Sequence, residues 1–529
     1  MFDMDEMFSI IQTAVWCILF AIGAVRYERY IVHMFQQNSY KPREYAEWMQ
    51  VHSNVGRLLG KCLYAIIAVP LVLIGNRGCM IAACAMNIMT ILVNKPQPAK
   101  KPLVYTKRVK RMLVTTAAIY VIAILLSFLA GEYRLRVCET VLLILFILHP
   151  FLILLVNLIN RPVEQAIDRH YINDAARILQ EMPNLTIIGV TGSYGKTSVK
   201  YFLSKLLSVQ YNVLHTPGNY NTTLGVVRTI REQMKPFHEI FVCEMGAREV
   251  GDIKEICDLV HPDHGIITSI GPQHLQSFHT IENIILTKFE LAGAVPADGK
   301  VFLNYDNEYI RAHKINKSVV SYGTVGDDIA YKAYDIAVSP SGSSFKMRDN
   351  RGDEYEFQTR LVGNHNVQNI AGAIAVANTL GISMEKLRYP VKQLESVPHR
   401  LQLIKQGNRI ILDDSYNSNK SGFKAALDTL AMFKELRILM TPGMVELGEK
   451  QYDENKEVGI YAADKCDYAV LVGREQTKPI QDGLKEAGFA GSRMIVVDTL
   501  QEAFQMVYAI PDEKQKVVLI ENDLPDNYA

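Results

Sequence analysis

Apolar runs fill the first 160 residues of this 529-residue chain and constrain its fold more than any other feature. A helix needs about 20 apolar residues to cross the hydrocarbon core of a bilayer. Runs of about that length are residues 7–25, 113–130 and 139–159. Residues 62–75 and 79–94 are shorter, and they predict either two short spans or a re-entrant hairpin. We therefore predict an α-helical, multi-span membrane domain over residues 1–160.

The charges between these runs predict their orientation. Basic residues gather in the loops 26–61 and 95–112, which lie on the same side if there are five spans. The positive-inside rule places that side, and everything after residue 160, in the cytoplasm. The second loop suits anionic membrane lipid, with a simply solvated loop as the equal alternative. A signal peptide fits poorly, because no basic residue precedes the first run. We expect a multi-pass protein of the cell membrane with cytoplasmic catalytic domains.

Composition adds two expectations. The 56 basic and 55 acidic residues nearly cancel, so we expect no nucleic acid partner. The eight cysteines form no CxxC pair and no Cys/His cluster with zinc spacing. We interpret them as reduced thiols, several of which lie in apolar stretches and pack as small hydrophobic residues.

A phosphate-binding loop is predicted just after the apolar part. Residues 186–190 (TIIGV) predict a strand, TGSYGKTS follows at 191–198, and a helical pattern continues to about residue 209. Glycines in such a loop let the backbone approach phosphates at the helix N-terminus, the lysine reaches the β/γ-phosphates, and the hydroxyl after it can bind Mg²⁺. The spacing departs from the strict pattern, since Gly189 lies six residues before Gly195. The candidates for binding ATP here are Gly192, Ser193, Gly195, Lys196, Thr197 and Ser198.

Three further residues are candidates for chemistry near this loop. Glu244 ends a predicted strand, His274 follows another, and Lys288 lies on a helical stretch. Ligands bind beyond the carboxyl ends of the strands in open α/β sheets. Taken alone, such a glutamate is often only solvated and such a histidine is often structural. Next to a phosphate-binding loop, Glu244 and His274 predict an Mg²⁺ site that the Thr197 hydroxyl can share.

The order of these motifs resembles that in the Mur ligase family. The matching strings are GVTGSYGKTSVK at 189–200, GNYNTTLGV at 218–226, EMGAREVGDI at 244–253, GPQHLQSFHTIENIILTKFE at 271–290 and NYDN at 304–307. Further along the chain they are GNHNVQN at 363–369, PHRL at 398–401, DDSYNSN at 413–419 and GMVELG at 443–448. The resemblance covers roughly residues 183–450, about half of the chain.

The resemblance implies an ATP-dependent ligase that forms amide bonds between a carboxylate and an amine. The carboxylate would first become an acyl phosphate, which the amine then attacks. Lys196, His274 and Lys288 would be catalytic, and Lys288 would be the lysine that family members carbamylate into a metal ligand. Asn369 would contact adenine, and Arg400 and Asp414 would complete the nucleotide site. The implied setting is synthesis of a cell-wall or envelope polymer such as peptidoglycan.

Departures from the family concern substrate recognition. Membrane-type segments stand where the family has its N-terminal domain, Gly443 stands where an aspartate is usual, and residues 521–526 are acidic where relatives are basic. The carboxylate and amine substrates therefore stay open, as does a lipid-linked substrate. The alternatives are a membrane-bound poly-amino-acid ligase and a non-catalytic ATP-binding scaffold. A third alternative, an ATP-driven transporter, is less favoured than these two, because the sequence shows no second ATPase module.

The sequence thus predicts a helical membrane domain (1–160), a linker helix (161–182) and two α/β domains. Residues 183–395 would form a parallel sheet with the phosphate-binding loop, and residues 396–529 would form a Rossmann-like domain. The latter is indicated by five predicted strands that alternate with helical segments, at 409–413, 437–441, 468–473, 494–498 and 516–520.

Overall fold

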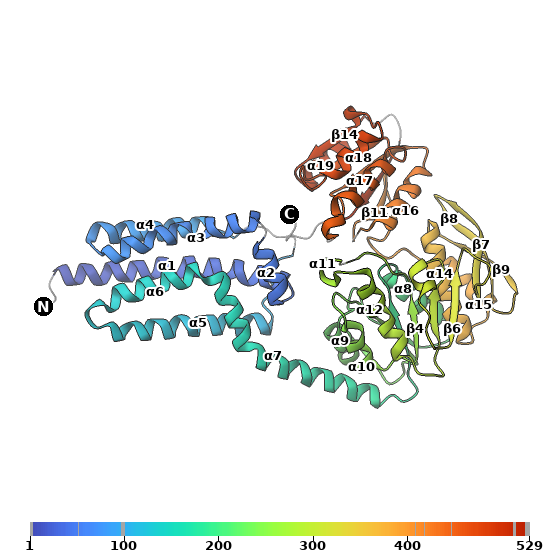
Figure 1. Cartoon of the computed structure of the whole chain (residues 1–529), viewed down its shortest axis with the longest axis horizontal. Coiled ribbons are helices and arrows are strands. Elements are labelled where there is room, and N and C mark those ends of the chain that lie inside the picture. Colours follow the sequence, from blue (N-terminus) through green and yellow to red (C-terminus); the bar gives the residue numbers. More distant parts are fainter. Residues whose placement is uncertain are drawn as a thin grey trace. The chain divides into compact units, whose positions relative to one another are not determined.

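The computed structural model divides the chain into two compact units, residues 1–169 and residues 170–523 (Figure 1). It describes residues 4–50, 52–96, 101–273, 275–407, 409–416, 418–445, 447–511 and 515–523.

The first unit is helical. Its elements are α1 (Met4–Gln37), α2 (Pro42–Gln50), α3 (His52–Ile74), α4 (Arg77–Val93), α5 (Lys107–Ser127), η1 (Phe128–Tyr133), α6 (Arg134–Ile147) and the start of α7 (His149–Gln180). Helices α1 and α3 to α6 pack side by side (Figure 1). The segments at 62–75 and 79–94 therefore lie on two packed helices, with a break at residues 75–76.

Two helical stretches, Asn54–Ile74 and Lys107–Gly131, are long and apolar enough to cross a membrane, and the bent pair α6–α7 can count as a third. The apolar run predicted over 139–159 lies on this pair and has a break, at which α6 and α7 meet at 84°; a broken span and a re-entrant loop both have such a bend. Pro150, which has no amide hydrogen, follows this break and cannot continue α6. Residues 161–182 were predicted as a linker helix, and residues 161–180 are helical as the second part of α7.

The second unit contains a nine-stranded and a six-stranded sheet. Strands of the first are β1 (Thr186–Thr191), β2 (Val213–His215), β3 (Ile240–Glu244), β4 (His264–Ile267), β5 (Val301–Asn304), β6 (Val319–Gly323), β7 (Tyr331–Ser339), β8 (Gly342–Arg348) and β9 (Glu354–Thr359). The order is β2-β3-β1-β4-β5-β6-β7-β8-β9. It is parallel as predicted from β2 to β7, and β8 and β9 add an antiparallel edge.

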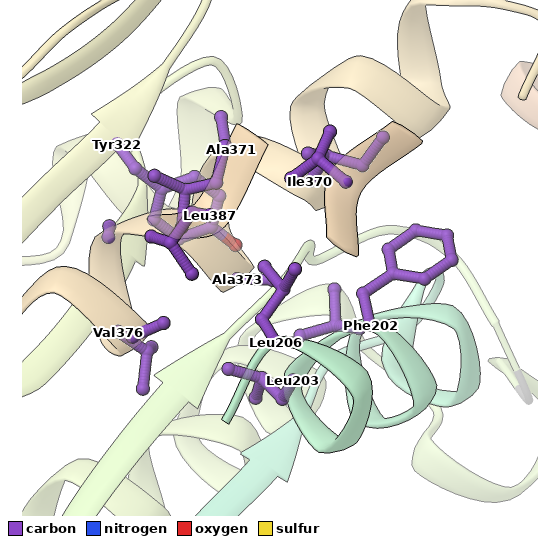
Figure 2. Packing of buried hydrophobic residues seen from close by; sticks show 14 of the residues in the cluster. Phe202, Leu203, Leu206, Tyr322, Ile370, Ala371, Ala373, Val376 and Leu387 are labelled. Atoms are coloured by element: carbon purple, nitrogen blue, oxygen red, sulfur yellow. The ribbon is translucent and has the colours of Figure 1, made fainter. Parts of the chain in front are cut away.

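Helices complete the first α/β domain. They are α8 (Lys196–Leu207), α9 (Thr223–Gln233), α10 (Asp252–Val260), α11 (Leu275–Phe278), α12 (Ile281–Ala294), α13 (Glu308–Ala312), α14 (Asn364–Thr379) and α15 (Met384–Lys392). Figure 2 shows the core that joins three of them: Phe202, Leu203 and Leu206 of α8 lie against Ile370, Ala373 and Val376 of α14 and Leu387 of α15. All seven side chains are at most 1% exposed, so this apolar contact holds the helix of the phosphate-binding loop in place.

The second α/β domain has the strand order β10-β11-β15-β12-β13-β14. The strands are β10 (Gln402–Gln406), β11 (Arg409–Asp414), β12 (Leu436–Thr441), β13 (Tyr468–Val472), β14 (Met494–Val497) and β15 (Lys516–Glu521). The helices are α16 (Lys420–Ala431), η2 (Gly448–Lys450), α17 (Gln451–Ala462), α18 (Lys478–Glu486), η3 (Gly491–Arg493) and α19 (Leu500–Ala509). The five predicted strands are confirmed as a parallel sheet, and the antiparallel strand β10 was not predicted.

Candidate active site

The phosphate-binding loop joins β1 to α8 and can be built only with glycine at two positions. The backbone of Gly192 has φ +151° and that of Gly195 has φ +80°, both in the region that disfavours a side chain. A Cβ at residue 192 would lie 2.1 Å from Thr268 Oγ1, and one at residue 195 would lie 2.7 Å from Asn369 Oδ1. The two glycines therefore let the loop pack against β4 and α14.

The segment after β4 clamps this loop. The Ser193 amide donates to the Ser269 carbonyl at 2.7 Å, and the Tyr194 amide donates to Ser269 Oγ at 2.8 Å. The Ser193 hydroxyl lies 3.1 Å from both the amide and the carbonyl of Gly271. The structure thus gives Ser193 a role in fixing the loop. Ser198 lies in the first turn of α8 and is partly exposed.

Lys196 is the first residue of α8, and its ammonium lies over the loop. It donates to the carbonyl of Gly192 at 2.5 Å and to that of Ser193 at 3.1 Å. Burial lowers the pKa of Lys196 to about 8, with Glu244 opposing the shift and Arg400 adding to it. The group is placed to meet an anion at the N-terminus of α8, where the helix dipole also favours negative charge.

Glu244 ends β3, the parallel neighbour of β1, so its carboxylate reaches the same sheet edge as the loop. Its Oε1 accepts from Thr197 Oγ1 and from Asn221 Nδ2, each at 3.1 Å. Its Oε2 forms an ion pair with Lys200 Nζ at 2.9 Å, and both side chains are at most 1% exposed. Burial acts to raise the pKa of Glu244, but the ammonium groups of Lys200 and Lys196 outweigh it and the pKa is lowered.

Lys288 lies on α12, and its side chain is 3% exposed. Burial lowers the pKa of Lys288 well below the usual range for lysine, and the Lys196 charge adds to the shift. Asp252 and Glu290 act in the opposite direction, but no carboxylate among the described residues forms an ion pair with the Lys288 ammonium. A neutral, nucleophilic amine is the form of lysine that reacts with carbon dioxide, so this environment suits the predicted carbamylation.

The predicted metal ligands are brought together in part. Thr197 and Glu244 touch, whereas His274 lies outside the described residues. Within the described ranges, no group of three His, Cys, Asp or Glu side chains could hold a metal ion by itself. A hydroxyl beside a carboxylate nevertheless offers the hard oxygen ligands that Mg²⁺ prefers.

Of the nucleotide residues predicted in the later motifs, Asn369 lies against the loop. Asn369, on α14, lies against Gly195, as the close approach of its Oδ1 shows. The Arg400 guanidinium lies over the Tyr416 ring, 4.1 Å from its centroid. Its positive charge contributes to lowering the pKa of Lys196. Asp414 ends β11 and accepts from the Leu401 amide at 3.0 Å.

Two features of the site escaped the sequence interpretation. Lys200 was not singled out, although it lies one helical turn after Lys196 on α8 and faces the same strand end. Asp306 of the NYDN string accepts from the amides of Thr324 and Val325 and from Gln368 Nε2 at 2.5 Å. It thereby ties the end of β5 to the residue preceding Asn369.

Two protein-family models match this chain. The model of the Mur ligase middle domain matches residues 190–377, and that of the Mur ligase glutamate ligase domain matches residues 399–521. This chain belongs to the Mur ligase family. The Mur ligase middle domain therefore contains the loop, Glu244 and Lys288, and its glutamate ligase domain begins at His399, beside Arg400.

Three similar proteins illustrate the match. UDP-N-acetylmuramoyl-tripeptide–D-alanyl-D-alanine ligase of Escherichia coli is 28% identical over 60% of this chain and 73% of its own length. The enzyme of the same name from Bacillus subtilis is 32% identical over 57% of this chain and 65% of its own length, slightly under two thirds. The crystal structure of MurF from Acinetobacter baumannii superposes with a TM-score of 0.62 at 25% identity, over 67% of this chain and 77% of its own.

Membership of this family makes the chain an ATP-dependent carbon–nitrogen ligase. The matched residues begin at 190, so neither domain model includes the helical unit.

Proposed function

We propose that the second unit joins a carboxylate of an envelope polymer precursor to an amine through an acyl phosphate. The observation that carries this proposal is the cluster of Lys196, Thr197 and Glu244 at one sheet edge, with Lys288 buried nearby. A carboxylate acylates amines poorly, and phosphorylation turns one of its oxygens into a leaving group. The relatives named above add D-alanyl-D-alanine to a peptidoglycan precursor, which makes peptidoglycan the polymer we favour.

The residues of the loop would do most of the work by charge and position. Lys196 would neutralise the β/γ-phosphates, and the amides at the N-terminus of α8 would hold their oxygens. Arg400, stacked on Tyr416, would add a second cation. Asn369, against Gly195, would contact the adenine ring, and Asp414 would bind the rest of the nucleoside.

Mg²⁺ is the metal that the site suits. Thr197, Glu244 and the carbamylated form of Lys288 would hold it, together with His274. When bound, it would neutralise charge on the phosphates. Lys200 would keep Glu244 ionised and aimed at Thr197.

We further propose that the first unit crosses the cell membrane, with the second unit in the cytoplasm and the substrate presented at the membrane surface. Unlike a water-soluble bundle, it carries apolar side chains on its outside as well as in its core. Glu28 and His149 are buried and contact each other inside it, whereas Val114 and Leu129 are 69% and 83% exposed. Exposed apolar side chains of this kind suit lipid contact, and buried polar ones mark functional interiors of membrane domains.

The experiment is an ADP-release assay with purified full-length protein in lipid nanodiscs. UDP-N-acetylmuramoyl-tripeptide and its lipid-linked counterpart are the carboxylate donors, and D-alanyl-D-alanine is the amine. We expect ADP release only when donor and amine are both present, and faster release with the lipid-linked donor. ADP release that needs neither substrate would contradict the ligase. Equal rates with both donors would contradict presentation at the membrane, leaving a simple anchoring role for the helical unit.

A further inference from the structure

An acid pair lies at the sheet edge of the second α/β domain. Asp414 ends β11, Glu521 ends β15, and the two are directly opposite each other in the parallel pairing of these strands. Both carboxyls therefore reach the edge where α/β sheets bind ligands. Asn522, the next residue, has φ +68°, and its side chain donates to the Gly443 carbonyl at 2.6 Å, which turns the chain away from this edge.

Glu521 is buried but incompletely satisfied. Its side chain is 1% exposed, and Oε1 accepts from the Ser418 hydroxyl at 2.5 Å. Oε2 is buried and receives no hydrogen bond from an N–H or hydroxyl of the described residues. It interacts with the carboxyl of Asp414, which can donate only when it is protonated. A buried carboxylate oxygen without a donor is costly, and its presence next to a catalytic site points to a ligand that supplies one.

The charges around the pair decide the kind of ligand. Two neighbouring charged groups act on the pair. Arg400 opposes the rise in the pKa of both carboxyls, and Asp413 adds to the rise in the pKa of Asp414. Arg400 is also within electrostatic range of Glu244 and of Lys196, so its charge acts on both the acid pair and the phosphate-binding site. A triphosphate is attracted by the lysine and the arginine and repelled by the pair. Asp414 can accept from the hydroxyls of the nucleoside placed there above, and the group that suits the remaining Glu521 oxygen is a cation.

We propose that Glu521, supported by Asp414, binds the ammonium group of the amine substrate and takes its proton. This inference rests on the ligase function proposed above, which needs an amine acceptor. At neutral pH an amine of this kind carries three protons on nitrogen and has no lone pair for attack. One proton passes from nitrogen to a Glu521 oxygen, which leaves a neutral amine and a protonated carboxyl.

The freed lone pair then forms the bond to the acyl carbon. The bond from that carbon to the phosphate oxygen breaks, and phosphate leaves with the electron pair. The nitrogen loses its second proton to the departing phosphate, and an amide remains. The environment suits a base of this kind, because burial raises the pKa of Asp414 to about 6 and raises the pKa of Glu521 well above its usual range. Bases with a pKa near the working pH transfer protons most effectively.

The test compares two nucleophiles on the full-length enzyme, with ATP and UDP-N-acetylmuramoyl-tripeptide. D-Alanyl-D-alanine arrives as an ammonium, whereas hydroxylamine is mostly uncharged at neutral pH and traps an acyl phosphate without a base. We expect Glu521→Gln to slow ligation of D-alanyl-D-alanine by about 100-fold or more at pH 7, the size of a lost general base. Hydroxamate formation should stay within about threefold, and ligation should recover as the pH rises and the free amine accumulates.

The matched control is Glu486→Gln, which removes a carboxylate 56% exposed on α18 that pairs with Lys456. It should leave both rates unchanged, since exposed ion pairs contribute little. Equal loss with both nucleophiles, or an unchanged pH profile in Glu521→Gln, would overturn the proposal, because a merely structural carboxylate gives those results. Nucleotide binding by Glu521→Gln should match the wild type and shows that the domain is folded. If the wild type releases no ADP with either nucleophile, the ligase assignment itself fails and this proposal fails with it.

Discussion

Removing one partner of the buried Lys200–Glu244 ion pair should destabilise the second unit strongly. Replacing Lys200 with methionine keeps much of its volume but removes the charge 2.9 Å from Glu244 Oε2. It also removes the donor to the Gly218 carbonyl, which lies 2.6 Å from Nζ. Breaking a buried pair by removing one partner costs about 3–5 kcal/mol, because the remaining charge stays buried. Thr197 and Asn221 still donate to Glu244, so we expect the lower end, about 3 kcal/mol.

Unfolding of this domain can be followed with a built-in probe. Both tryptophans, Trp16 and Trp48, belong to the helical unit and do not report on the second unit. Cys243, next to Glu244 on β3, is 0% exposed, so a thiol reagent reaches it only when the domain opens. Labelling of the Cys243 peptide, measured by mass spectrometry across a urea series, gives the midpoint. With a urea dependence of about 2 kcal/mol per molar, Lys200→Met should lower the midpoint by about 1.5 M.

Two further variants make this prediction sharp. Lys254→Met breaks a pair with Asp258 in which both side chains are more than 60% exposed, and it should lower the midpoint by less than about 0.3 M. The double variant Lys200→Met with Glu244→Gln removes both charges. Its loss of unfolding free energy should be about 2 kcal/mol smaller than the sum of the losses in the two single variants. An exposed pair contributes at most about 0.5 kcal/mol, which corresponds to a midpoint shift of about 0.3 M. A midpoint for Lys200→Met within that distance of the wild type would refute the reasoning.

Further outcomes are expected for the same site. Lys196→Ala should abolish ATP turnover while labelling of the Cys243 peptide stays normal, and near-normal ADP release would remove the loop from the mechanism. Lys288→Ala should lose most activity without rescue by bicarbonate, whereas an ordinary surface lysine would leave the rate within about twofold. Gly195→Ala should weaken nucleotide binding measured by calorimetry, since its Cβ meets Asn369 at 2.7 Å and φ is +80°. The pKa of Glu244 is lowered, so its stabilisation is complete above the ordinary carboxyl pKa and is lost as pH falls through the folded value. The gap between wild type and Lys200→Met should therefore narrow in acid.

Local patterns in the sequence predicted the elements that carry the phosphate-binding loop. The strand at 186–190, the glycines and the helix after them each obey short-range rules, and the structure has them as β1 and α8. Strand ends of a parallel sheet share one edge, which is why Glu244 could be placed beside the loop from its position alone. The five strands of the last domain were equally readable, since each is a short apolar run between turn residues.

Contacts between residues far apart in the chain could not be predicted from the sequence. Nothing local shows that Ser269 and Gly271 clamp Ser193, or that Asn369 lies against Gly195. Lys200 looked like one more helix lysine, because its partner Glu244 is 44 positions away in the sequence numbering. The bend before α7 could have been read from Pro150, but the apolar run continues across it and hides the break.

The most direct test of the ligase assignment is a stable-isotope experiment with wild-type full-length protein. The donor carboxylate of UDP-N-acetylmuramoyl-tripeptide carries ¹⁸O, and released phosphate is analysed by mass spectrometry after ligation to D-alanyl-D-alanine. An acyl phosphate transfers one labelled oxygen from the carboxylate to each phosphate, and Lys196→Ala should form neither product. We predict one ¹⁸O per phosphate and one amide per ADP. Unlabelled phosphate accompanying amide formation would contradict the proposed mechanism, and ADP release without any amide would contradict the ligase itself.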